Sequence, residues 1–185
     1  MTSPNRLVVF IDGQNLYFTA KSLGFDVDFK RLLAHFAAQG TLVRAYYYTT
    51  IVADQEFTSI RPLTDWLEYN GFAVRAKPAK EFDDGEGRRK TKRSIAVDLA
   101  VDAFDMAKYV DHAVLITGDG DLRPVVEAVQ RRAVHVTVVS TLRTNPPMIA
   151  DELRRQADTF LELDNLKRVI GRTVAQSLQQ RSIVR

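Results

Sequence analysis

The sequence predicts a three-layer α/β/α fold, in which helices cover both faces of a central, mainly parallel sheet of about five or six strands. Short apolar runs rich in β-branched and aromatic residues recur along the 185 residues, and a longer segment of helical character follows each run. This alternation is typical of parallel sheets, because each helix carries the chain back across the sheet in a right-handed crossover. The length and the 45% hydrophobic content suit one domain with one sizeable core.

The expected strands are the apolar runs themselves, and the expected helices lie between and after them. Gly40 and the pair Asn70-Gly71 are stop signals at two of the helix ends. The strands are expected at residues 7–11, 42–48, 72–75, 113–117 and 134–139. The helices are expected at residues 28–39, 55–70, 94–110, 122–131 and 148–156.

Two segments break this rhythm. Residues 77–93 contain Pro78, glycines and a basic run but no apolar periodicity, so the sequence predicts a long mobile loop there. Residues 164–185 are basic with a weak helical pattern, which predicts a helix or tail after a domain of residues 1–163. The apolar positions of this tail would suit a homodimer contact.

Composition narrows the chemistry. There are 26 Lys and Arg residues against 23 Asp and Glu, and the formal charge of +3 mildly favours a polyanionic partner. The chain has no cysteine, which rules out disulfides, thiolate zinc sites and a catalytic thiol, so any metal would have oxygen ligands. The apolar run at residues 7–11 is too short for a signal peptide or a membrane span. We therefore expect a cytoplasmic protein with no membrane contact.

Acidic residues directly after strands are the main candidates for a site, because ligands of open parallel sheets bind outside the carboxyl ends of the strands. Asp12 follows the first expected strand, in the motif Asp12-Gly13-Gln14-Asn15. Gly13 allows a tight turn there, and Asn15 can orient a ligand or a water molecule. The alternative is that Asp12 only caps a helix or forms a turn.

A second acidic motif, Thr117-Gly118-Asp119-Gly120-Asp121, follows the expected strand at residues 113–117. Asp121 is well placed to cap the next helix, but capping explains one aspartate and not both. The two glycines let backbone and carboxylates approach an ion closely, which favours a functional role for the motif.

Three further aspartates lie on the helix expected at residues 94–110. Asp98 and Asp102 are four residues apart, so they share one face about 6 Å apart along the axis. Only the start of the helix would lie at the edge of the sheet, so Asp98 is the best candidate and Asp102 the next. Asp105, roughly 10 Å further along than Asp98, is assigned to solvent or structure. A solvated acidic stripe would explain all three residues equally well.

A cluster of Asp12, Asp98, Asp119 and Asp121 at one end of the sheet would bring like charges together. Such a cluster is costly unless a cation neutralises it. Mg²⁺ or Mn²⁺ is the cofactor that fits carboxylate ligands best.

At these residues the sequence resembles the NYN domain family, in the LabA-like branch of the PIN-like nucleases. Three segments carry the resemblance in order and spacing, residues 8–15, 92–103 and 115–122. The resemblance implies a PIN-like (Rossmann-like) fold and divalent-metal hydrolysis of RNA. The middle segment departs from many relatives, which have a Lys-Gly pair and an additional Asp where this chain has Lys92-Arg93 and Ala96. Either Asp98 substitutes for that Asp, or the site is weaker.

The expected reaction is hydrolysis of an RNA phosphodiester by water that a divalent cation activates. Asn15 and Thr117 would position the water or a phosphate oxygen, and some carboxylates would act through bridging water. The expected catalytic residues are Asp12, Asn15, Asp98, Thr117, Asp119 and Asp121, and the expected metal ligands are Asp12, Asp98, Asp102, Asp119 and Asp121.

A purely acidic site would repel RNA, so a basic segment has to hold the backbone. The run of Arg88, Arg89, Lys90, Lys92 and Arg93 precedes the Asp98 helix and is predicted to clamp single-stranded or structured RNA. A solvated loop without a partner is the alternative. DNA remains an alternative substrate, because no feature of the sequence reads a 2′-hydroxyl.

Aromatic and histidine side chains add little to this site. The three tyrosines at residues 46–48 are expected to fill the core and to leave one exposed ring for stacking on a base. His35, His112 and His135 have no mutual metal-ligand spacing and are treated as structural.

The sequence bears on three other functions. A haloacid-dehalogenase-like phosphatase would need a second Asp at position 14, which is Gln. A dinucleotide-binding enzyme would need a glycine-rich phosphate loop after the first strand, where this chain presents an acid. The third is a catalytically weak or inactive PIN-like module that binds RNA or a protein partner, which Arg93 and Ala96 favour.

Overall fold

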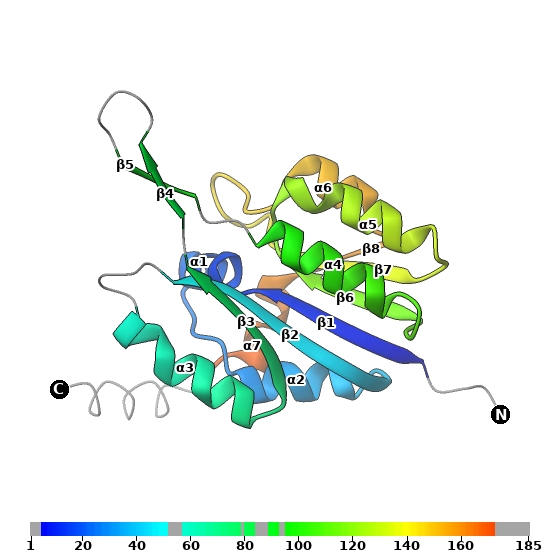
Figure 1. Ribbon diagram of the computed structural model, residues 1–185. Coiled ribbons are helices and arrows are strands. Elements are labelled where there is room, and N and C mark those ends of the chain that lie inside the picture. The colour runs from blue at the N-terminus through cyan, green and yellow to red at the C-terminus, as the bar shows by residue number, and fades with distance from the viewer. Residues whose placement is uncertain (1–4, 52–56, 79, 84–88, 93–94, 173–185) are drawn as a thin grey trace.

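The computed structural model describes residues 5–51, 57–78, 80–83, 89–92 and 95–172. Within these ranges one six-stranded sheet forms the centre of the molecule (Figure 1). Its strands are β1 (Arg6–Asp12), β2 (Thr41–Ile51), β3 (Phe72–Pro78), β6 (His112–Ile116), β7 (His135–Ser140) and β8 (Thr159–Glu162). They lie in the order β3-β2-β1-β6-β7-β8, and all of them are parallel. The carboxyl ends of all six strands therefore meet at one edge of the sheet.

Helices connect the strands and cover both faces of the sheet. Among the described residues they are α1 (Gly13–Ser22), α2 (Phe29–Ala37), α3 (Phe57–Tyr69), α4 (Ala96–Met106), α5 (Arg123–Gln130), α6 (Asp151–Gln156) and α7 (Leu163–Ile170), with a 3₁₀ turn at Gly120–Leu122. Acidic side chains cap several of their first turns, because a carboxylate accepts hydrogen bonds from backbone amides that have no partner within the helix. Asp12 caps α1, Asp28 caps α2, and Glu162 caps α7.

The core is divided into two layers by the sheet. On one face, side chains such as Leu16 of α1, Phe36 of α2 and Leu166 of α7 pack with α3 against the sheet. On the other face, Leu99 of α4 and Val126 of α5 pack with α6. Alternate side chains of each strand supply the two layers, as the strand period of two requires. The three-layer α/β/α prediction, with a mainly parallel sheet of about five or six strands, is confirmed.

Five elements differ from the sequence-based expectation: β3, β4 (Lys80–Asp83), β5 (Arg89–Lys92), α1 and β8. The prediction of a long mobile loop at residues 77–93 is wrong in part, because β3 continues to Pro78 and β4 pairs antiparallel with β5. A polar strand pair of four residues each has no apolar periodicity to detect. Helix α1 and strand β8 were not expected, since α1 follows Asp12 without a loop and β8 is only four residues long.

The segment after β8 folds against the domain. Helix α7 buries Leu163, Leu166 and Ile170, and Arg31 donates a 3.1 Å hydrogen bond to the carbonyl of Gly171. Most of the predicted tail, residues 173–185, lies outside the described residues. No helix in the described part of the chain is long and apolar enough to cross a membrane.

Candidate active site

Asp12 is the last residue of β1, near the centre of the carboxyl edge of the sheet. Its side chain is only 8% exposed. One carboxylate oxygen accepts a 3.1 Å hydrogen bond from the amide of Asn15, and the other accepts a 3.3 Å bond from the hydroxyl of Thr117. Burial raises the pKa of Asp12 more than these bonds lower it, and the nearby charge of Asp119 raises the pKa further. The ionised form of Asp12 therefore lacks the stabilisation that a cation would supply.

The turns after β1 and β6 are joined by hydrogen bonds. The side-chain oxygen of Asn15 accepts a 3.0 Å bond from the amide of Gly118. The hydroxyl of Thr117 donates to Asp12 and accepts a 3.2 Å bond from the amide of Asp119. Neighbouring parallel strands thus deliver Asp12, Asn15, Thr117 and Asp119 to one place, as the sequence predicts.

Asp119 and Asp121 differ in their surroundings. Asp119 is exposed and caps the 3₁₀ turn through a 3.0 Å hydrogen bond from the amide of Asp121. The side chain of Asp119 also borders the same cleft as Asp12, whereas Asp121 is exposed and does not line that cleft. Capping was expected for Asp121, but Asp119 supplies the cap.

Gly118 is required by packing. A Cβ on Gly118 would lie 1.6 Å from the carbonyl oxygen of Met148, so no side chain fits there. The amide of Ala150 also donates a 3.0 Å hydrogen bond to the Gly118 carbonyl. The chain before α6 therefore packs directly against Gly118. This contact holds the Asp119 turn in place.

A cleft opens beside Asp12 at this edge of the sheet. Its lining includes Asn15, Phe18, Thr50, Ile95 and Asp119. Thr50 is 2% exposed, and its hydroxyl has no hydrogen-bond partner among the described residues. An unpartnered buried hydroxyl is costly, so one at a cleft wall is a candidate ligand-binding group.

Asp98 lies in the first turn of α4 and forms an ion pair with Lys77 at the end of β3. Both side chains are partly exposed. The sequence predicts Asp98 as a metal ligand, and the structure pairs its carboxylate with a lysine. Its role as a ligand stays a prediction.

Asp102, one turn further along α4, is held by two other groups. The hydroxyl of fully buried Tyr48 donates a 2.9 Å hydrogen bond to it, and Nε of Arg75 donates a 3.2 Å bond to the same oxygen. Burial and the Asp102 charge raise the pKa of Tyr48. These bonds anchor Asp102 between α4, β2 and β3, and its role as a metal ligand stays a prediction.

Only a few carboxylates at the cleft are available as ligands for a hard divalent cation. Among the described residues, no group of three or more acidic or histidine side chains is arranged to hold a metal. Mg²⁺ is commonly bound through one or two carboxylates while it keeps several waters. Asp12 and Asp119 meet that requirement, so the residues present fit a site of two carboxylates better than the expected larger cluster.

The predicted basic clamp falls largely on residues whose side chains are not described. Arg89, Lys90 and Lys92 belong to strand β5, which pairs with β4. Arg88 and Arg93 lie outside the described residues. Their contact with RNA stays a prediction.

The predicted exposed tyrosine is not found. Tyr46, Tyr47 and Tyr48 are at most 8% exposed, because helices cover both faces of β2. The ring of Tyr46 stacks on Phe10 with centroids 5.3 Å apart. The prediction that one exposed ring of this run stacks on a base is therefore wrong, and the three tyrosines pack in the core.

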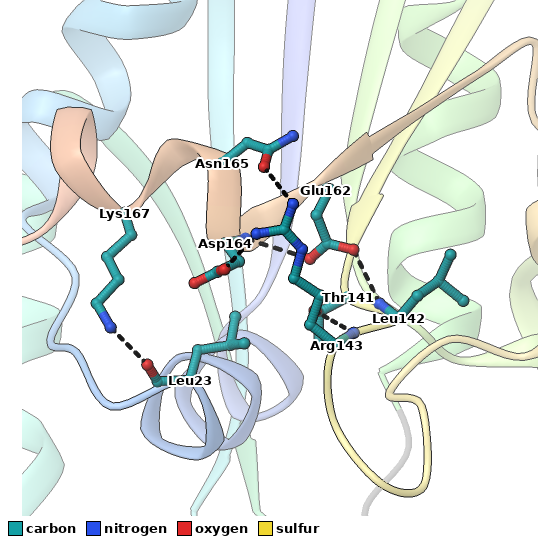
Figure 2. A network of polar contacts seen from close by, with 8 residues as sticks. All are labelled: Leu23, Thr141, Leu142, Arg143, Glu162, Asp164, Asn165 and Lys167. Atoms are coloured by element: carbon teal, nitrogen blue, oxygen red, sulfur yellow. Dashed lines mark hydrogen bonds and ion pairs between the residues drawn. The ribbon is translucent and has the colours of Figure 1, made fainter.

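A second polar cluster lies at the same sheet edge, after β7 and β8. Figure 2 shows Arg143 bound to Asp164 and Asn165, at 2.6 and 2.9 Å. Glu162 accepts a 2.9 Å hydrogen bond from the Leu142 amide, and Lys167 donates to the Leu23 carbonyl. The contacts of Leu142 and Arg143 fix the loop after β7 to the end of β8 and to α7, and Lys167 joins α7 to the end of α1.

Sequence reasoning missed Thr50 and Lys77 because both strands are longer than expected. The expected strands end at residues 48 and 75, whereas β2 continues to Ile51 and β3 to Pro78. Extending the period-two alternation by one step in each strand would have placed Thr50 and Lys77 on the α4 face.

The comparisons with known proteins agree with this architecture. A model of the NYN domain matches residues 6–164. The low amplitude and bright protein LabA of Synechococcus elongatus is 35% identical over 174 residues, which cover 92% of this chain and 90% of that protein. The crystal structure of a protein of unknown function from Vibrio parahaemolyticus superposes with a TM-score of 0.71 and 25% identity, over 89% of this chain and 96% of that one.

Proposed function

The chain belongs to the NYN domain family, and on that premise we propose that it is a divalent-metal-dependent ribonuclease that hydrolyses RNA phosphodiester bonds. The family is generally nuclease-like. One observation carries the proposal: Asp12, a buried carboxylate whose pKa is raised by burial, lines the same cleft as Asp119 at the carboxyl edge of the sheet.

Asp12 and Asp119 would hold Mg²⁺ or Mn²⁺, and the ion would supply positive charge for the phosphodiester transition state and lower the pKa of a water. The protein contributes a fixed geometry. Thr117 orients the Asp12 carboxylate, and Asn15 holds the Asp119 turn through the Gly118 amide.

The substrate proposal is RNA, single-stranded or structured, held by the basic residues of β5 that the sequence predicts as a clamp. Lys and Arg contacts to phosphates would offset the acidity of the site. Further ligand roles for Asp98, Asp102 and Asp121 are not needed for this proposal.

Cleavage of labelled single-stranded and hairpin RNA tests the proposal. Wild-type protein is compared in Mn²⁺, Mg²⁺ and EDTA with Asp12→Asn and Asp119→Asn. Asp151→Asn is the matched control, because Asp151 is an exposed aspartate on α6 that pairs with Arg155 at 2.7 Å. We expect metal-dependent products from wild type and the control and none from the two site variants. No cleavage by folded wild-type protein with either metal would refute the proposal.

The second candidate is a PIN-like module that binds RNA or a protein partner without effective catalysis. The ion pair of Asp98 with Lys77 and the bonds of Asp102 to Tyr48 and Arg75 favour it, since they leave the α4 carboxylates bound within the protein. RNA binding that is unchanged by EDTA, together with no cleavage, would support this candidate.

A further inference from the structure

We propose that Thr50 and Lys77 form a phosphate-binding subsite beside Asp12, which takes a backbone phosphate of a single-stranded nucleic acid. This inference rests on the proposed function, because it names the part of the same cleft that binds the substrate. It assigns substrate contacts to two residues on neighbouring strands, outside the predicted carboxylates and the predicted clamp.

Thr50 supplies a hydroxyl at the wall of the cleft. The side chain is 2% exposed and lines the cleft together with Asp12, Asn15 and Asp119. Its oxygen has no hydrogen-bond partner among the residues that the structure describes. A threonine hydroxyl can donate to a phosphate oxygen, so a phosphate in the cleft would satisfy it.

Thr49 shows that a buried hydroxyl alone does not define the subsite. It is equally buried and also lacks a partner within the described ranges. Successive side chains of a strand point to opposite faces, so Thr49 faces away from α4 and does not line the cleft. Thr49 is therefore a matched control for Thr50.

Lys77 brings a positive charge next to Thr50. The register of β2 and β3 pairs Thr50 with Lys77, so both side chains leave the same face of the sheet from strands about 4.8 Å apart. Lys77 forms an ion pair with Asp98 in the first turn of α4, and Ile95, just before that turn, lines the cleft. Lys77 is not itself a lining residue of the cleft, but its ammonium group pairs with the helix turn that follows Ile95, on the same sheet face as Thr50.

Because the cleft is acidic, substrate binding there needs a positively charged side chain. Asp12 and Asp119 would repel a phosphodiester, and an ammonium group donates strong hydrogen bonds to phosphate oxygens. Asp98 positions Lys77 through their ion pair and restrains its flexible side chain. Asp98 is a positioning residue in this subsite.

Binding without metal tests the subsite independently of cleavage. Fluorescence anisotropy of a labelled single-stranded RNA is measured in EDTA across a salt series. We expect Lys77→Gln to weaken binding several-fold and to reduce the salt slope by about one, while Lys77→Arg keeps the slope. Thr50→Val should weaken binding at least about threefold and Thr50→Ser should restore it, as expected for a lost hydrogen bond.

Two control variants remove the same kinds of side-chain group at positions outside the proposed subsite. Lys108→Gln removes a lysine that pairs with Asp105 at 3.4 Å beyond the far end of α4, and Thr49→Val removes the other buried hydroxyl. Both should bind RNA as wild type does, and circular dichroism verifies that every variant is folded.

The outcomes separate this inference from the proposed function. Any of three results would overturn the subsite. The first is unchanged affinity and salt slope in Lys77→Gln, and the second is an equal loss of affinity in Thr49→Val and Thr50→Val. The third is no RNA binding by wild type. Metal-dependent cleavage with unchanged Lys77→Gln binding would refute the subsite alone. Loss of binding in Lys77→Gln and Thr50→Val without cleavage by wild type would refute the nuclease alone.

Discussion

The side-chain oxygen of Asn15 accepts a 3.0 Å hydrogen bond from the backbone amide of Gly118. The two residues are 103 positions apart in sequence, yet this bond joins the first turn of α1 to the turn that carries Asp119. The distance between the carboxylates of Asp12 and Asp119 therefore depends on an asparagine that is itself no obvious metal ligand.

Asn15→Ala should destabilise the protein by about 1–3 kcal/mol, because the Gly118 amide loses its acceptor in a partly buried place. Urea unfolding in EDTA measures this change. Asn165→Ala is the control, since Asn165 is exposed and accepts one bond from Arg143 at the surface. Equal stability changes in the two variants would mean that the bond does not hold the turns together.

Asp12→Asn should leave the stability of the metal-free protein unchanged or higher at pH 7. The pKa of Asp12 is raised in the folded protein, so the stability that this group contributes is present below its unfolded pKa and is lost as pH rises through the folded value. Asparagine keeps an acceptor for the Asn15 amide and removes the buried charge. Urea unfolding in EDTA tests this, and a loss above about 1 kcal/mol would assign Asp12 a structural role.

Asp102→Ala should destabilise the protein by about 1–3 kcal/mol, because the buried hydroxyl of Tyr48 and the guanidinium of Arg75 lose their shared partner. Asp105→Ala is the control, and its exposed pair with Lys108 should change stability by less than about 0.5 kcal/mol. Calorimetric Mn²⁺ affinity should stay within about twofold of wild type in Asp102→Ala. A tenfold loss would instead make Asp102 a metal ligand.

Stability should fall as the pH drops below about 6.5, the unfolded pKa of histidine. Burial, followed by the charge of His135, lowers the pKa of His112 in the folded protein. The unfolded state then binds more protons, so the stability from neutral His112 is present above the unfolded pKa and is lost as pH falls. Urea unfolding at pH 7.5 and 5.5 should show a smaller loss for His112→Gln. Equal losses in both proteins would remove His112 as the cause.

The sheet and most helices followed from the sequence because buried parallel strands are continuous apolar runs. The strands at residues 7–11 and 113–117 were placed within one residue of β1 and β6 at each end. Helix α1 could not be recognised because it begins at a motif that also reads as a turn, Asp12-Gly13-Gln14-Asn15. Strand β8 is short and only partly buried, so its sequence carries little signal.

The sequence predicted the part of the candidate site that adjacent strands bring together. Asp12, Asn15, Thr117 and Asp119 lie together because β1 and β6 are adjacent. The surroundings of the α4 carboxylates depend on tertiary contacts with β3. No local sequence pattern predicts that Lys77 pairs with Asp98.

The central claim is that Asp12 and Asp119 together hold a divalent cation, and Mn²⁺ titration of the metal-free protein by calorimetry tests it most directly. We predict that wild type binds Mn²⁺ and that Asp12→Asn and Asp119→Asn each bind it at least about tenfold more weakly. Asp151→Asn should match wild type. Equal binding by wild type and both site variants, or no binding by any of the proteins, would contradict the account.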